Sequence, residues 1–87
     1  MFDQIETLST LAATGTMTRT ATQLRITQST VSKRIAALER EVGQPLTEAH
    51  GRGVRLTPVG HRLLERAAPL VAALRQALRE EETHHTG

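Results

Sequence analysis

The sequence predicts a small, mainly α-helical domain in which three short helices precede a β-hairpin and one long C-terminal helix. Three observations support this fold class. Apolar residues recur every three or four positions over most of the 87 residues, which is the period of an amphipathic helix. Glycines and a Thr-Pro pair separate these segments. One short stretch near the middle alternates apolar and polar residues, as a strand does.

The first helix is predicted over residues 2–13, where the apolar positions share one face: Phe2, Ile5, Leu8, Leu11 and Ala12. Gly15 follows at the position where a helix commonly ends in a left-handed residue. Thr16 or Thr18 can then accept a backbone N–H at the start of a second, shorter helix that ends near Ile26.

A third helix is predicted over residues 28–42, with Thr27 as its cap and Gly43 at its end. Its apolar stripe must face the core: Val31, Ile35, Leu38 and Val42. The other side of its first turns is polar and carries no acid: Gln28, Ser29, Ser32 and Lys33. Because only about three residues separate it from the second helix, the two must meet at a sharp angle, as in a helix-turn-helix.

A β-hairpin is predicted next, with strands at residues 46–48 and 54–57. The tip between them, residues 49–53, carries Arg52 between two glycines. Such a tip can bring a basic side chain close to another backbone, because glycine has no side chain of its own.

The last helix is predicted from Thr57-Pro58, a capping hydroxyl followed by a proline suited to the first helical position, to about Glu82. At ~1.5 Å per residue this helix is roughly 36 Å long, more than a small core can cover. We expect Pro69 to bend it. Its apolar seam comprises Leu63, Ala67, Leu70, Leu74 and Leu78. Such a seam normally packs against a second helix, most simply its copy in a homodimer.

Positive charge is concentrated in the middle of the chain. The formal net charge is +2, but residues 17–66 carry nine Arg and Lys against four Glu. A local positive potential attracts polyanions whatever the total charge of the chain.

The composition excludes several classes of function. The chain has no Cys, a single aromatic residue and four His (His50, His61, His84 and His85) without metal-ligand spacing, so we expect no metal and no cofactor. No nucleophile–base pair or phosphate-binding glycine loop indicates an enzyme. No apolar run is long enough for a membrane span, and the N-terminus has no signal-peptide pattern. We therefore expect a cytoplasmic protein.

Four stretches, in order, resemble the N-terminal DNA-binding domain of LysR-type transcriptional regulators. Residues 15–21 (GTMTRTA) resemble the family's GS-x-T-x-A-A segment, and residues 27–35 (TQSTVSKRI) resemble its recognition-helix pattern SQ-x-A-V-S-x-x-I. Residues 38–43 (LEREVG) are similar to LE-x-x-L-G, and residues 56–60 (LTPVG) to LT-x-x-G. The resemblance covers residues 2 to about 82, which is nearly the whole chain.

The resemblance implies a winged helix-turn-helix: a three-helix core and a short β-hairpin wing (residues 1–57), followed by a linker and dimerisation helix (58–82) and a hinge or tail (83–87). We expect the effector-binding domain of the family to be absent from this sequence, so that a small-molecule effector could act only through that domain. A homodimer would bind double-stranded DNA in a sequence-specific manner and regulate transcription, and the family also allows tetramers of full-length proteins. The helix over about 28–42 would enter the major groove, and the wing, residues 46–57, would contact the backbone or the minor groove.

The residues expected to contact DNA lie on the second helix, the recognition helix and the wing: Thr18, Gln28, Ser29, Thr30, Ser32, Lys33, Arg34, Arg52 and Arg55. Gln28 is suited to pair with adenine through two hydrogen bonds. The expected dimer interface is the seam of the linker helix: Leu63, Ala67, Leu70, Leu74 and Leu78. The sequence departs from the family at Thr47, usually a large apolar residue, and at Ala49, usually Arg; Arg52 or Arg55 is expected to supply that charge.

Two alternative functions remain open from the sequence. One is a helical protein-interaction module that dimerises through residues 58–82 and has no role on DNA. The other is a winged-helix regulator of a different family, such as the molybdate-responsive type.

Overall fold

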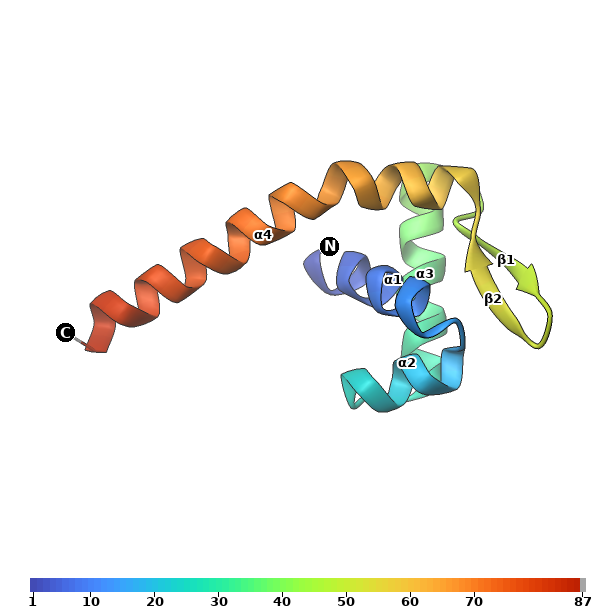
Figure 1. Cartoon of the computed structure of the whole chain (residues 1–87), viewed down its shortest axis with the longest axis horizontal. Helices are drawn as coiled ribbons and strands as arrows, with labels where there is room; N and C mark the ends of the chain where they lie inside the picture. Colours follow the sequence, from blue (N-terminus) through green and yellow to red (C-terminus); the bar gives the residue numbers. More distant parts are fainter. Residues whose placement is uncertain (87) are drawn as a thin grey trace.

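The computed structural model describes residues 1–86 of the chain, and the side chains of residues 1–81. Its elements follow the predicted order (Figure 1): α1 (Phe2–Thr14), α2 (Met17–Leu24), α3 (Gln28–Val42), β1 (Thr47–His50), β2 (Gly53–Leu56) and α4 (Pro58–Thr86). The three short helices form one compact unit, the hairpin projects from its side, and α4 crosses above it and extends outward. This arrangement confirms the predicted fold class, a winged helix-turn-helix with a long C-terminal helix.

The helices begin at the residues that the sequence indicated, and α1 and α3 are followed by the predicted glycines. Gly15 and Gly43 follow α1 and α3 in the left-handed conformation, with φ of 77° and 79°. Of the two candidate caps for α2, Thr16 has this role, since its hydroxyl accepts the backbone N–H of Arg19 at 3.1 Å. Thr27 caps α3 in the same way. These local signals therefore set the sharp turn, residues 25–27, between α2 and α3.

The core lies where α1, α2 and α3 meet, and the two ends of the hairpin close it: Leu8, Leu11, Ala21, Val31, Ile35, Leu38, Leu46 and Leu56 are buried. The prediction that Val42 faces the core with the rest of its stripe is wrong, because this side chain is 36% exposed. The last turn of α3 reaches past the core, and Val42 lines a groove beside α4 instead.

The hairpin is a regular antiparallel pair in which Thr47 faces Leu56 and His50 faces Gly53. β1 starts one residue later and ends later than predicted, so the tip is shorter. The wing is fastened to the helices, because the backbone N–H of Val54 donates to the carbonyl of Gly15 at 2.9 Å. Thr47 is half-buried at the start of β1, and the preceding Leu46 is fully buried.

α4 packs tightly on the start of the hairpin. A Cβ atom at Gly60 would collide with the carbonyl oxygen of Leu46, so only glycine permits this close approach. The helix continues to Thr86, beyond the predicted end at Glu82. Pro69 lies inside it, and α4 changes direction about halfway along its length, as expected (Figure 1). The molecule measures 50 × 25 × 19 Å because the distal half of α4 projects beyond the body.

Among the described residues, no helix combines the length and the apolarity that a membrane crossing requires.

Candidate nucleic-acid interface

The first two turns of α3 present a polar, exposed surface. Gln28, Ser29, Ser32 and Lys33 are all exposed, whereas Val31 and Ile35 point into the core. These four exposed residues are called the recognition face below. The structure therefore brings together the residues that sequence analysis placed on one side of this helix. Their amide, hydroxyl and ammonium groups are the types that hydrogen-bond to base edges and phosphates.

Two other predicted contact residues on α3 have partners within the chain. The hydroxyl of Thr30 lies 2.9 Å from that of Thr27 and belongs to the cap of the helix. The guanidinium of Arg34, which is half-buried, donates to the hydroxyl of Thr7 on α1 at 3.4 Å. Both residues lie outside the recognition face, and a role for them on DNA stays a prediction.

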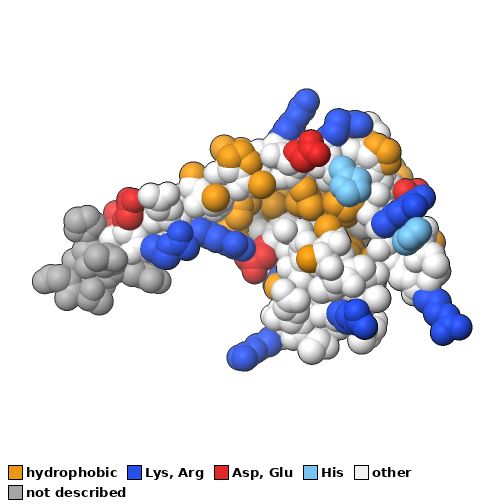
Figure 2. Space-filling model, viewed as in Figure 1, with side chains coloured by type: hydrophobic (Ala, Val, Ile, Leu, Met, Phe, Trp, Pro, Cys, Tyr) orange, Lys and Arg blue, Asp and Glu red, His pale blue; other side chains and the backbone are white. Residues whose placement is uncertain are grey.

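The helix-turn-helix is free of negative side chains over a long stretch. Between Glu6 and Glu39 the chain contains no acid and four bases: Arg19, Arg25, Lys33 and Arg34. Arg19 and Arg25 are exposed on and after α2, near the exposed Thr18, yet the sequence analysis did not select them. The absence of acids around them was the signal that could have identified them. Figure 2 shows basic side chains spread over the helical unit and the wing. The resulting positive potential suits a phosphate backbone.

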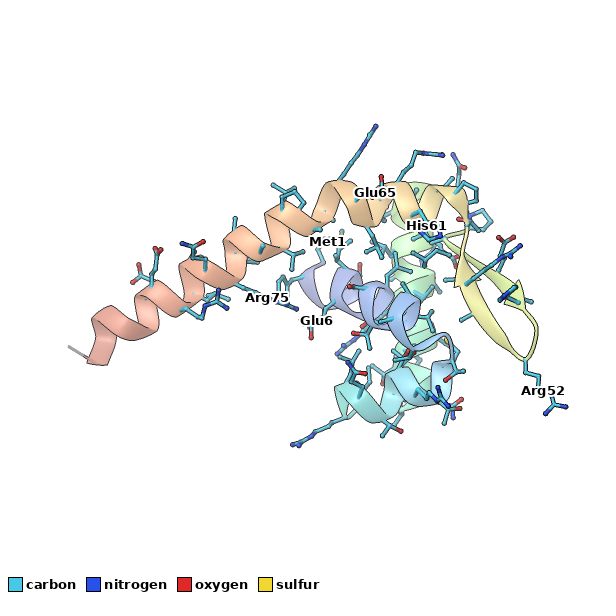
Figure 3. All side chains as sticks on the ribbon, viewed as in Figure 1. Met1, Glu6, Arg52, His61, Glu65 and Arg75 are labelled. Carbon is cyan, nitrogen blue, oxygen red and sulfur yellow. The ribbon has the colours of Figure 1, made fainter. Side chains whose placement is uncertain are left out.

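The two arginines of the wing differ in their surroundings. Arg52 lies at the tip, directly after Gly51 (φ 58°), and points away from the molecule (Figure 3). Arg55 faces Glu48 across the hairpin, and its Nε donates to the Glu48 carboxylate at 3.2 Å. Since the charge of Arg55 is balanced by Glu48, Arg52 is the stronger candidate for a phosphate or minor-groove contact.

The distal part of the α4 seam is open to solvent in the single chain, whereas Ala67 is half-buried and Leu63 packs, half-buried, against the core of the same chain. Leu70, Leu74 and Leu78 are 72%, 44% and 56% exposed. Leu70 and Leu74 line an apolar groove of about 500 Å³ together with Leu63 and Ala67. The other wall of this groove includes Met1, Phe2 and Val42. Apolar side chains gather along α4 and where it meets the helical unit (Figure 2). The groove and the exposed leucines beyond it mark this surface as a candidate contact with another molecule.

Among the described side chains, no three His, Cys, Asp or Glu residues converge in a way that could hold a metal ion. His50 and His61 are exposed on β1 and α4. The side chains of His84 and His85, and Gly87, lie outside the described residues. The backbone of residues 83–86 belongs to α4, and a role of residues 83–87 as a hinge or tail stays a prediction.

Comparison with known proteins identifies similar sequences. The family model described as bacterial regulatory helix-turn-helix protein, lysR family, matches residues 2–61. An uncharacterized HTH-type transcriptional regulator of Vibrio cholerae serotype O1 is 40% identical over 83 residues, which is 95% of this chain and 29% of that protein. The HTH-type transcriptional activator CmpR of Synechocystis is 36% identical over 73 residues, which is 84% of this chain and 24% of the activator. The chain thus spans about a quarter of the length of these relatives.

Solved structures have the same fold over nearly the whole chain. The CbnR_DBD–DNA complex superimposes with a TM-score of 0.85 at 27% identity, covering 98% of both chains. The BenM_DBD/catB site 1 DNA complex gives a TM-score of 0.87 at 26% identity, covering 100% of this chain and 97% of that one. Given the family match over residues 2–61 and the shared architecture, this chain belongs to the LysR family of bacterial regulatory helix-turn-helix proteins.

Proposed function

We propose that this domain binds double-stranded DNA in a sequence-specific manner as a homodimer and thereby regulates transcription. The observation that carries the proposal is the recognition face: an exposed, acid-free surface on the first turns of the second helix of a helix-turn-helix. In this fold such a helix lies in the major groove, and its N-terminal residues contact base edges.

Each predicted contact has a role that its chemistry supports. Gln28 and Ser32 have groups that can read base edges, and Lys33 and Ser29 can reach either bases or phosphates. Thr18 and Arg19 are both exposed in the first turn of α2, and their hydroxyl and guanidinium groups would bind phosphate on one side of the recognition helix. Arg52 would bind the backbone or the minor groove on the side of the wing.

A second copy of the chain is the occupant that we propose for the groove beside α4. The leucines of the seam are too exposed for a stable isolated surface, and two copies of a seam on parallel or antiparallel helices cover one another. A dimer of this kind places two recognition helices on half-sites about 34 Å apart, one turn of the duplex. A symmetric protein would therefore bind a palindromic or nearly palindromic site.

Relatives support this role. The CbnR and BenM DNA-binding domains, which cover nearly the whole of this chain, have been crystallised with DNA, and CmpR is named a transcriptional activator. Since bacterial DNA lies in the cytoplasm, we assign the chain to that compartment.

The salt dependence of binding tests the proposal. We expect about three exposed cations of each protomer to bind phosphates, so that the dimer displaces roughly six counterions from the DNA. Because added salt opposes this release, the affinity should fall roughly a thousand-fold between 50 and 200 mM salt. The measurement is a titration of labelled duplex, selected from random DNA, at these two salt concentrations. A folded dimer that binds no duplex even at low salt would refute DNA binding and favour the protein-interaction module.

A further inference from the structure

A bend and a contact determine where the distal half of α4 points. Pro69 lacks the N–H that would bond to the carbonyl of Glu65, and its ring pushes that turn of the helix apart. Beyond this bend α4 passes the N-terminal end of α1 before it extends outward, and there Arg75 lies next to Glu6 although 69 positions separate them in sequence (Figure 3).

Arg75 is held to α1 from two sides. Its Nη2 donates to Oε2 of Glu6 at 2.9 Å, and its guanidinium carbon lies 5.7 Å from the centre of the Phe2 ring. Phe2 and Glu6 are one helical turn apart on α1, so both lie on the face that α4 passes. The three residues form what we call the α1–α4 clasp.

Packing around the clasp leaves room for movement. A cleft of about 210 Å³ lies between α1 and α4, lined by Ile5 and Ser9 on one side and by Leu64, Ala68 and Val71 on the other. Glu6 and Arg75 also line this cleft, so apolar side chains do not fill the space between the two helices here. The ion pair and the aromatic contact of Arg75 therefore join α4 to α1 beyond the bend, with the side chains of Arg75 and Glu6 50% and 35% exposed.

We propose that the α1–α4 clasp, acting with the bend at Pro69, selects the spacing between the two half-sites that a dimer binds. The inference rests on the proposed function, in which α4 joins two recognition helices. The ten residues from Pro69 to Arg79 span roughly 15 Å, so a swing of about 15° at the bend displaces the far end by roughly 4 Å. One base pair adds about 3.4 Å along the duplex and turns the half-site by about 34–36°, so a displacement of this size, together with the change of angle, alters which spacer fits the dimer best.

Spacer preference in matched variants tests the clasp. Duplexes carry two copies of the selected half-site with spacers shortened or lengthened by one and two base pairs, and a further duplex carries one half-site. For Arg75→Gln we expect the preference for the best spacer over its neighbours to fall at least threefold. Affinity for the single half-site and the melting temperature should stay unchanged, which a merely structural role of Arg75 would not produce.

Two further variants complete the test. The charge exchange Glu6→Arg with Arg75→Glu restores the ion pair but not the contact with the Phe2 ring, so it should restore part of the spacer preference that Arg75→Gln loses. Arg66→Gln removes an equal charge from α4 away from the clasp and should retain the preference of the unmodified chain.

The outcomes separate the clasp from the proposed function. If the unmodified chain prefers one spacer and Arg75→Gln keeps that preference, the clasp is overturned and DNA binding by a dimer stands. If the unmodified chain binds all spacers equally, half-site spacing is not selected and the inference fails. If it binds no duplex, the proposed function fails first.

Discussion

Replacing two leucines of the α4 seam by glutamate should convert the dimer into a folded monomer. Leu70 and Leu74 are 72% and 44% exposed in the single chain, and burying a whole leucine side chain contributes about 1.5–3 kcal/mol. Scaled by the exposed fractions and counted in both protomers, covering these two residues stabilises the dimer by about 3–7 kcal/mol. Leu70→Glu with Leu74→Glu removes this contribution and places four carboxylates along the seam of a dimer.

The lower end of that range already weakens dimerisation by more than about 100-fold. Folding of the protomer should change little, because both positions are exposed and glutamate is a good helix former. Sedimentation velocity reports the dimer, and thermal melting followed by circular dichroism reports the fold. Gln76→Glu, which adds a charge on the opposite side of α4, serves as the control and should stay dimeric.

Two results would refute this reasoning. A double variant that still sediments as a dimer at the same concentration would show that the seam is not the interface. A double variant that loses its cooperative melting would show that these leucines stabilise the single chain. That result would contradict the expectation, drawn from their exposure, that they contribute little to folding.

Three further substitutions test the fold and the interface. Gly60→Val should destabilise the domain by about 1–3 kcal/mol in urea melts, because its side chain collides with the carbonyl of Leu46; an unchanged midpoint would contradict the close approach. Thr27→Ala removes the cap that accepts the N–H of Thr30 and should cost ~1 kcal/mol in the same melts, whereas Thr27→Ser should cost less. Arg52→Ala should weaken binding to selected and random duplexes alike and lower the salt slope by about one per protomer, and a loss confined to the selected duplex would indicate base reading instead.

Local signals in the sequence were sufficient to predict most of the fold. Gly15 and Gly43 end helices because they adopt left-handed φ values, and Thr16 and Thr27 start helices because their hydroxyls accept backbone N–H groups. Apolar periodicity then identified most of the buried face of each short helix, although Ala12 and Val42 follow the period and are exposed. These features depend on residues a few positions apart, which is why a single sequence reveals them.

The sequence did not reveal contacts between distant segments. Val42 continues the period of its stripe, but whether a neighbour covers the last turn of α3 depends on where α4 lies. The bond from Val54 to the carbonyl of Gly15 and the ion pair between Arg75 and Glu6 join residues from separate elements, and no spacing rule predicts them. The sequence also did not reveal which charged residues pair with one another. Glu48 lies opposite Arg55 only because of the register of the two strands, which the sequence did not predict.

For the candidate interface, the sequence predicted which residues form the exposed face of α3. It did not predict which side chains on that helix already have hydrogen-bond partners within the chain. Gln28, Ser29, Ser32 and Lys33 are exposed as expected. Arg34 could not be separated from Lys33 by residue type, because both are basic and adjacent. The structure separates them: Arg34 reaches Thr7, and Lys33 faces solvent.

The central claim, that the recognition face reads DNA sequence, is tested most directly by Gln28→Ala on two duplexes. Dissociation constants are measured side by side at one salt concentration for the selected duplex and a random duplex, with Gln44→Ala, an exposed glutamine beyond the far end of α3, as the control. Loss of a base contact should cost about 1–3 kcal/mol on the selected duplex and little on the random one, so the specificity ratio should collapse. Equal losses on both duplexes, or no loss on either, would contradict the claim that Gln28 reads the sequence.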